Sequence, residues 1–335
     1  MTQSILITGA GGAAAVSFMK AIANEGWTVH AADMDPMAPG LFMVPPERRH
    51  VVPPGGHPDF AIRLLQLALD VGAHVVVPTV DVELEPVARA RRAFQTHGIL
   101  PMVPSRDALV TCLDKAELMR AVPEAIAPRW AILDDAFDGD DWPLPLVAKP
   151  RTGAGGRGVE IVHTREHLER LPRDGHLLVQ EHLPGEEYSV DVLLDPEGAV
   201  WATVPRSRMR TDSGVAIVAR TVRDPDLMAR ARAAAAAAGL SWVCNVQLRR
   251  DRNGVPKLLE INPRFPGTMS LTVASGVNMP SIALQMATAV RAGRTMARPD
   301  LHFAELGMVR TWQERYVLAH ELHDGARPHA AIKVA

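Results

Sequence analysis

The residues best suited to chemistry lie in one stretch, CNVQLRRDRNGVPKLLEINPRFPG, at residues 244–267. Apolar and polar residues alternate through Val243–Leu248, Asn253 and Gly254 supply a turn, and Lys257–Ile261 has the composition of a returning strand. The pattern therefore predicts a β-hairpin that carries polar side chains on one face.

Three oxygen-bearing side chains of this hairpin are expected to converge. Gln247 lies on one strand and Glu260 on the other, and Asn262 shares the face of Glu260 because alternate residues of a strand point the same way. Such a set suits Mg²⁺, or alternatively Mn²⁺, held together with phosphate oxygens. Arg264 follows two residues later and could neutralise a transferring phosphoryl group if the strand persists. The alternative is an amphipathic hairpin with a solvated polar face.

A second candidate segment begins at Lys149, which a short strand, Leu146–Ala148, delivers into the sequence RTGAGGRG. Glycines allow backbone N–H groups to approach phosphate oxygens, and the neighbouring cations add positive charge. The predicted strand Val159–Val162 makes this loop a hairpin tip that could close over a nucleotide. It is not a P-loop, and a plain flexible turn is the alternative. The glycines concerned are Gly153, Gly155, Gly156 and Gly158.

Two further segments could contact a nucleotide. The helix predicted after Ser105 carries Asp114 and Lys115, although a lysine on a helix is usually solvated. The sequence QEHLPGEEY at residues 180–188 joins two predicted strands and could offer backbone groups to an adenine edge and a carboxylate to ribose hydroxyls. An exposed acidic loop is the alternative.

Three arginines, Arg206, Arg208 and Arg210, recur at every second position. If the segment is extended, this spacing places them on one face, where their guanidinium groups could bind a carboxylate or a phosphate. A solvated basic face explains the same spacing.

The first hundred residues alternate strands with helices, which predicts a doubly wound parallel sheet. Gly9–Gly12 forms a glycine turn before a helix, a place able to hold an anion. A dehydrogenase would use Asp33 for the ribose, but Ala14 replaces the third glycine of that fingerprint, so a scaffold role is favoured. The elements expected are a strand at residues 5–8, a helix over Ala13–Asn24, a strand over Trp27–Ala32, a helix over Asp59–Val71 and a strand over Val75–Val77.

Asp81 and Glu83 follow the predicted strand Val75–Val77 directly. Ligands of open α/β sheets gather beyond the carboxyl ends of the strands, so these carboxylates could hold a substrate ammonium group. The alternative is that they stabilise the positive end of the next helix.

Length and composition set the frame for these sites. A chain of 335 residues with 47% hydrophobic and 22% charged residues is expected to form two or three globular domains. A net charge of −2 gives no argument for nucleic-acid or membrane binding. Cys112 and Cys244 are too few for a disulfide framework, and no signal-type or membrane-spanning apolar run is present, so a cytoplasmic protein is expected.

The order of these parts resembles the ATP-grasp superfamily, and within it the carbamoyl-phosphate-synthetase-like carboxylate–amine ligases. The resemblance covers roughly residues 1–290 and is most specific in the EINPR segment and in the ordered pair of Lys149 and the glycine loop. It implies an α/β protein, with α+β character in the ATP-grasp part. Three domains are expected: a Rossmann-like domain at 1–104, a small ATP-grasp subdomain with the glycine lid at 105–182, and a large subdomain with the metal site and tail at 183–335.

The resemblance also implies roles for matching residues. Lys115 and Lys149 resemble the cations that hold ATP phosphates, and Gly153–Gly158 the lid over them. Glu181, His182 and Leu183 resemble the adenine hinge, and Glu187 the ribose carboxylate. Gln247, Glu260 and Asn262 resemble the metal ligands, and Arg264 the arginine that steadies an acyl phosphate. Many ATP-grasp ligases have an acid where this chain has Gln247, and glutamine there resembles the carbamoyl-phosphate-synthetase branch.

The expected function is ATP-dependent formation of an amide bond through an acyl phosphate, with release of ADP and phosphate. Arg264, Lys149 and Arg208 are the candidate catalytic residues, and a small amino-acid-type acid and an amine are the expected substrates. Related ligases are often dimers, so a homodimer is considered beside a monomer. The alternatives are an ATP-grasp kinase and a nucleotide-binding protein without turnover.

Overall fold

The computed structural model describes residues 3–153, 155–212, 214–311, 313–324 and 327–328. By their internal contacts, the residues fall into two compact units. Unit 1 comprises residues 1–106, 264–303 and 310–335, and unit 2 comprises residues 107–263 and 304–309. The three-domain division expected from the sequence stays a prediction.

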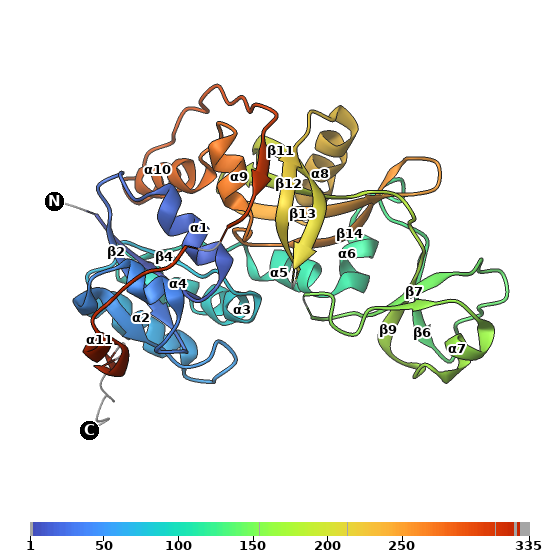
Figure 1. Cartoon of the computed structure of the whole chain (residues 1–335), viewed down its shortest axis with the longest axis horizontal. Helices are drawn as coiled ribbons and strands as arrows, with labels where there is room; N and C mark the ends of the chain where they lie inside the picture. The colour runs from blue at the N-terminus through green and yellow to red at the C-terminus, as the bar shows by residue number, and fades with distance from the viewer. Residues whose placement is uncertain (1–2, 154, 213, 312, 325–326, 329–335) are drawn as a thin grey trace. The chain divides into compact units, whose positions relative to one another are not determined.

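Unit 1 is built on a parallel six-stranded sheet in the order β16-β3-β2-β1-β4-β5 (Figure 1). Residues 5–7 of β1 and all of β4 are apolar and fully buried, as expected for strands covered on both faces. The doubly wound sheet predicted for the N-terminal part is confirmed. The strands are β1 Ser4–Ile7, β2 Thr28–Asp33, β3 Arg49–Val51, β4 Val75–Val77, β5 Leu100–Pro101 and β16 Arg327–Pro328.

Helix α2 of unit 1 is amphipathic and buries Phe60, Leu64 and Leu67 on one face. The helices of unit 1 are α1 Ala13–Ala21, α2 Phe60–Asp70, α3 Asp81–Arg89, α4 Arg91–Thr96, α9 Met269–Ala274, α10 Met279–Arg291 and α11 Ala319–Asp324, with short 3₁₀ helices at Pro39–Met43 and Pro46–Arg48. No helix of the described residues is both long and apolar enough to span a membrane.

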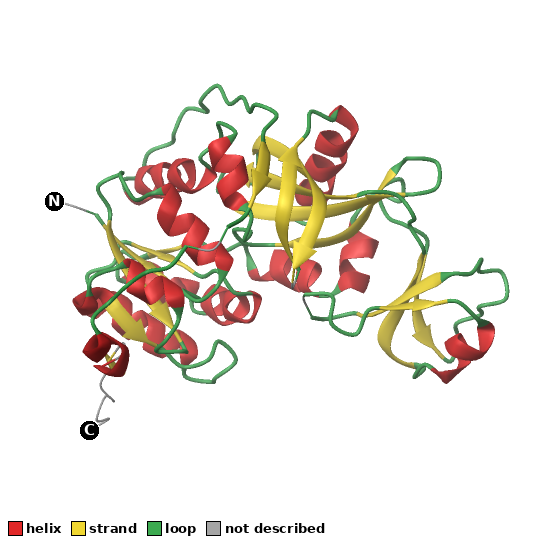
Figure 2. Ribbon diagram, viewed as in Figure 1, coloured by secondary structure: helices red, strands yellow, loops and turns green. Residues whose placement is uncertain are grey.

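Unit 2 contains two antiparallel sheets, drawn in yellow in Figure 2. The smaller has the order β6-β9-β7-β8, and the larger has the order β14-β13-β10-β11-β12-β15. The antiparallel α+β architecture expected for this part is therefore confirmed. The strands are β6 Trp130–Asp134, β7 Leu146–Pro150, β8 Glu160–Val162, β9 Asp174–Glu181, β10 Glu187–Leu194, β11 Val200–Asp212, β12 Val215–Thr221, β13 Val243–Arg250, β14 Pro256–Asn262 and β15 Gly307–Val309.

Helix α8, Pro225–Ala237, packs on the larger sheet through small residues, among them Ala231, Ala234 and Ala235. Alanine favours the helix and lets it approach the strands closely. The remaining helices of unit 2 are α6 Lys115–Ala121 and α7 Arg165–Arg170, and α5 Arg106–Leu113 begins at the boundary between the units.

One expected helix is interrupted. The sequence predicts that Asp114 and Lys115 lie on a single helix after Ser105, but α5 ends at Leu113 and α6 begins at Lys115. Asp114 has extended backbone angles and its carboxylate accepts the N–H groups of Ala116 and Glu117. Asp114 is therefore the N-cap of a second helix, and Lys115 is the first residue of that helix.

Candidate functional site

The hairpin predicted at residues 244–267 is present as β13 and β14. In its antiparallel register Gln247 lies opposite Glu260, and Asn245 lies opposite Asn262. The three predicted metal-ligand residues are thus on adjacent strands of unit 2, and each is partly buried. The hairpin itself was predicted from the alternation of residues, and its register shifts between Gln247 and Leu248.

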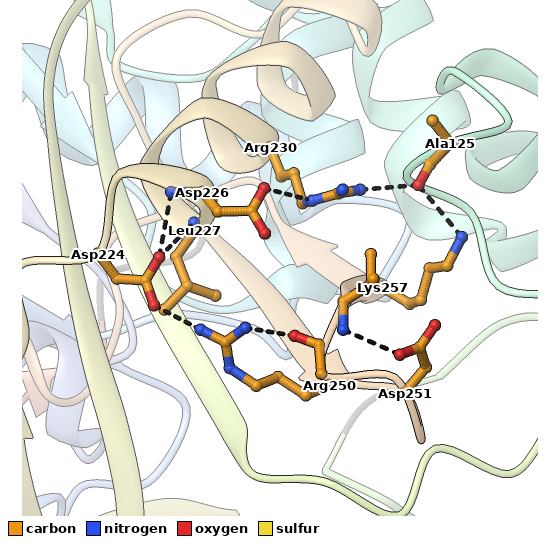
Figure 3. A network of polar contacts seen from close by, with 10 residues as sticks. Ala125, Asp224, Asp226, Leu227, Arg230, Arg250, Asp251 and Lys257 are labelled. Carbon is orange, nitrogen blue, oxygen red and sulfur yellow. Dashed lines mark hydrogen bonds and ion pairs between the residues drawn. The ribbon is translucent and has the colours of Figure 1, made fainter.

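A network of polar contacts holds the far end of this hairpin (Figure 3). Asp224 caps α8 through the N–H groups of Asp226 and Leu227, and it also pairs with Arg250 on β13. On β14, the Lys257 ammonium donates to the Ala125 carbonyl at 3.2 Å. These contacts fix β13 to the start of α8 and β14 to the loop before β6. They lie at the turn end of the hairpin, away from Gln247 and Glu260.

Lys149 is a deeply buried cation of the candidate site. It lies on β7 with 5% of its surface exposed, and its ammonium donates to Gln180 Oε1 at 2.7 Å and to the Leu259 carbonyl at 3.1 Å. Burial lowers the pKa of Lys149 to about 8; nearby Glu260 raises it and Lys115 lowers it. A lysine held in this way gains an energetically favourable partner when an anion such as a phosphate arrives.

Lys115 lies beside the same carboxylate. Its ammonium is 3.9 Å from Glu260 Oε2 and donates to the Gly153 carbonyl at 2.9 Å, and the residue is 8% exposed. The alternative that this lysine is solvated is therefore excluded, and its expected role as a phosphate-binding cation stays a prediction. Two cations, Lys115 and Lys149, thus gather around Glu260 within unit 2.

The base of the glycine loop is tied to the start of α6. Arg151 pairs with Asp114, with Nη2 to Oδ2 at 2.6 Å and Nε to Oδ1 at 3.2 Å, and the Lys115 N–H donates to the Arg151 carbonyl at 2.8 Å. Arg151, which was expected to add positive charge for phosphates, is thus paired with a carboxylate of the chain itself.

The loop itself is a hairpin tip, because β7 and β8 pair antiparallel. Its glycines have positive φ angles, which residues other than glycine rarely adopt. The angles are 121° at Gly153, 73° at Gly155, 71° at Gly156 and 72° at Gly158. The sequence RTGAGGRG therefore has a backbone reason for its glycines. Ala154, within the predicted lid, lies outside the described residues.

The oxygen donors present suit Mg²⁺. Gln247, Glu260 and Asn262 offer amide and carboxylate oxygens, the hard ligands that Mg²⁺ prefers, and phosphates would complete the coordination. The Asn262 amide nitrogen donates to Glu260 Oε1 at 3.4 Å, so the amide oxygen of Asn262 takes no part in this contact. No group of three or more His, Cys, Asp or Glu side chains able to hold a metal occurs in the part of the chain that the structure describes. Amides therefore supply two of the three donors.

The predicted adenine hinge follows β9. Glu181 ends this strand and its carboxylate accepts the Arg129 N–H at 2.8 Å, which fixes the segment to the start of β6. Leu183 is 2% exposed, while His182 is only partly buried, and burial together with nearby cations lowers the pKa of this histidine. The role of this segment in binding adenine stays a prediction.

The three arginines of β11 do not share one environment, contrary to their predicted common face. Arg206 is 2% exposed and forms a bidentate pair with Asp191, at 2.7 and 3.0 Å. Arg208 pairs with Glu187, the predicted ribose carboxylate, at 2.8 Å, whereas Arg210 is exposed. The pairing of β11 with β12 is also irregular between Arg208 and Arg210, which disturbs the alternation of faces.

The N-terminal glycine turn is occupied by the chain's own carboxylate. The Gly11 N–H donates to Asp33 Oδ2 at 2.7 Å, so this turn already holds an anion. The scaffold role preferred for Gly9–Gly12 fits this contact better than a dinucleotide site.

Glu83 is also used internally. It is 6% exposed and accepts from Thr8 Oγ1 at 2.5 Å, and burial raises its pKa to about 7. Because its carboxylate lies beneath the ends of β1 and β4, Glu83 does not offer an exposed ammonium site.

Arg264 lies beyond the strand that was expected to carry it. Strand β14 ends at Asn262 and Pro263 follows, so the strand does not persist to Arg264. The Arg264 guanidinium forms a bidentate pair with Asp81, with Nε to Oδ1 at 2.7 Å and Nη2 to Oδ2 at 2.8 Å. Both residues belong to unit 1.

Sequence reasoning missed two partners. Gln180 binds the ammonium of Lys149, and Asp191 neutralises Arg206 and accepts from the Asn245 amide at 2.7 Å. The only sequence signal for either residue was a polar side chain inside an apolar strand, which identifies a buried polar group but not its partner.

Two family models match separate segments of the chain. Residues 173–308 match an ATP-grasp family described as belonging to the biosynthetic pathway with the Ter operon, and residues 5–103 match the PylC-like N-terminal domain. The large chain of carbamoyl phosphate synthase from Clostridium botulinum is 23% identical over 207 residues, which are 57% of this chain. The chain spans about one fifth of the length of this relative, 19%.

Solved structures share the fold. Biotin carboxylase from Campylobacter jejuni, solved as a βγ-ATP complex, has a TM-score of 0.71 at 17% identity, over 90% of this chain and 73% of that one. L-amino acid ligase from Bacillus licheniformis has a TM-score of 0.63 at 17% identity, over 85% of this chain and 74% of that one. The resemblance stated from the sequence is confirmed.

Proposed function

We propose that this chain, an enzyme that belongs to the ATP-grasp superfamily, joins a small carboxylic acid to an amine at the expense of ATP. The observation that carries the proposal is the group of Lys115, Lys149 and Glu260, with Gln247 and Asn262 on the same hairpin and a glycine loop at the end of β7. The fold and the ATP-grasp ligase class support it. ADP and phosphate are the expected products.

The chain's cations bind and orient the triphosphate. Lys149, whose charge burial disfavours, is stabilised in its charged form by a phosphate, and Lys115 contributes a second cation beside Glu260. The glycine loop brings backbone N–H groups to the phosphates and excludes water from them. Backbone groups of Glu181 through Leu183 hold the adenine, and Glu187 accepts from the ribose hydroxyls.

Phosphoryl transfer requires alignment and charge neutralisation rather than a protein nucleophile. A carboxylate oxygen of the acid attacks the γ-phosphorus, the bond to the β-phosphate oxygen breaks, and ADP leaves. The amine then attacks the acyl carbon, and the C–O bond to phosphate breaks as a proton leaves the nitrogen. Lys149 neutralises charge on the phosphoryl group in these steps, and the catalytic role expected for Arg264 stays a prediction.

Gln247, Glu260 and Asn262 would hold Mg²⁺, which when bound neutralises charge on the phosphate oxygens. Glu260 has a further effect without the metal, because its charge raises the pKa of Lys149. Glu260 thereby helps to keep the lysine protonated for phosphate binding.

Amino-acid-type substrates are proposed because a structure of the same fold is an L-amino acid ligase. Arg208 and Arg210 are the arginines of β11 that remain candidates for the substrate carboxylate, since Arg206 is buried with Asp191. A homodimer stays a prediction, which light scattering of the purified chain would test.

The experiment is to incubate the chain with Mg-ATP and pools of amino acids and small carboxylic acids, and to measure ADP, AMP and free phosphate together. ADP and phosphate that depend on both an acid and an amine support the proposal. ADP without phosphate would show a kinase, and AMP with pyrophosphate would overturn the acyl-phosphate route.

A further inference from the structure

Unit 1 carries a pocket of about 590 Å³, and all of its lining residues belong to that unit. The segment after α1, the residue before β1 and the second half of α10 supply its walls, and α10 packs against α1 (Figure 1). A volume of this size is typical of small-molecule sites in proteins. None of the residues considered for ATP or for the metal lines this pocket.

Hydrogen bonds join the segments that line the pocket. The Thr288 hydroxyl of α10 donates to Gln3 Oε1 at 3.0 Å, and Asn278, the N-cap of α10, donates to the Ala21 carbonyl of α1 at 2.9 Å. Gly26 turns the chain between α1 and β2 with a φ of 75°, and a Cβ at this position would meet no atom within 4 Å. The pocket is therefore already formed in the chain without a ligand.

Two exposed side chains of opposite charge line the pocket. The Glu25 carboxylate accepts from the Asn278 amide at 3.4 Å, and it forms no ion pair within the described part of the chain. The Arg294 guanidinium has neither a hydrogen bond nor an ion pair with any residue that the structure describes. Glu25 repels a purely anionic ligand and Arg294 repels a purely cationic one. The two charges together favour a ligand that carries both signs.

Neutral groups of the pocket complement these charges. The Gln285 amide donates to the Ser281 hydroxyl at 3.2 Å, so its oxygen takes no part in this contact and can accept from an ammonium group. The Gln3 oxygen accepts from Thr288, and the Gln3 amide N–H groups can donate to a carboxylate. Trp27 is half-buried and lines the pocket with its indole, a large surface for an apolar or aromatic side chain.

We propose that this pocket binds a free α-amino acid with an apolar or aromatic side chain. The ammonium group binds Glu25 and the Gln285 oxygen, the carboxylate binds Arg294 and the Gln3 amide, and the side chain packs on Trp27. An arginine suits the carboxylate because its planar fork can donate two parallel hydrogen bonds. The site is independent of the proposed reaction, since the pocket contains no residue of the candidate ATP site.

The test is isothermal titration of the full chain without ATP, with L-phenylalanine as the probe. Two analogues each lack one charge: L-phenylalaninamide has no carboxylate, and 3-phenylpropanoate has no ammonium group. We expect L-phenylalanine to bind at one site per chain and each analogue to bind about ten-fold more weakly, because each loses a charge-assisted hydrogen bond. Equal affinity for the three compounds, or the absence of any heat, would overturn the proposal.

Variants assign the binding to this pocket rather than to a substrate site elsewhere on the chain. Arg294→Gln and Glu25→Gln should each weaken L-phenylalanine binding about ten-fold. Arg92→Gln, which removes an exposed arginine of α4 outside the pocket, is the matched control and should bind like the wild type. Wild-type affinity in both pocket variants would overturn the proposal. ATP is absent throughout, so these outcomes are distinct from a failure of the proposed ligase reaction.

Discussion

Replacing Lys149 by Met should remove a pH dependence of the unfolding free energy. The size of that dependence follows from the pKa that burial gives the lysine. The pKa of Lys149 is about 8 in the folded chain against 10.5 for an ordinary lysine. The unfolded chain therefore binds more protons between these values, so the free energy of unfolding of the wild type rises with pH across this window. A difference of about 2.5 pKa units corresponds to roughly 3 kcal/mol. Met has nearly the same shape and no titration, so this rise should be absent in Lys149→Met.

The assay is equilibrium urea unfolding of wild type and variant without nucleotide, from about pH 7 to about pH 10.5. The difference in unfolding free energy should change by roughly 3 kcal/mol in favour of the wild type as pH increases. Lys257→Met, which removes a half-buried lysine of β14, is the matched control for replacing a lysine by methionine. A pH-independent difference for Lys149→Met would refute the argument that burial lowers this pKa.

Three further changes have defined outcomes. Glu83→Gln should gain about 2 kcal/mol of stability relative to wild type between about pH 5 and pH 8. The folded pKa of Glu83 near 7 lies above 4.5, so the wild type loses stability as pH rises; urea unfolding of wild type and variant at both pH values measures it. Asp191→Asn leaves Arg206 buried without a carboxylate and should cost about 3–5 kcal/mol, readable as a lower melting temperature. Glu260→Ala should abolish ADP formation with unchanged circular dichroism, and substantial ADP would contradict the assignment of the site.

The hairpin of β13 and β14 could be predicted because its signals are local. Alternation with period two and an Asn-Gly turn locate the two strands, whereas an irregularity between Gln247 and Leu248, which these local signals do not show, brings Glu260 opposite Gln247. The glycine loop was predictable for the same reason, since each glycine reports a backbone angle at its own position.

The features that could not be predicted depend on partners distant in sequence. Regular spacing placed Arg206 with two other arginines, but its environment is decided by Asp191, fifteen residues away on the neighbouring strand. Asp114 lay within an apparently continuous helix, and the break there is stabilised by Arg151 at the base of the glycine loop. Similarly, no local pattern shows that Asp81 and Arg264 meet, since they are 183 residues apart.

The central claim is that the acid is activated as an acyl phosphate. The most direct test supplies an ¹⁸O-labelled carboxylic acid, its amine partner and Mg-ATP, and follows the label by mass spectrometry. The mechanism predicts one ¹⁸O atom in the inorganic phosphate for each amide formed, because the attacking carboxylate oxygen leaves with the phosphate. Unlabelled phosphate, or ¹⁸O in AMP, would contradict it.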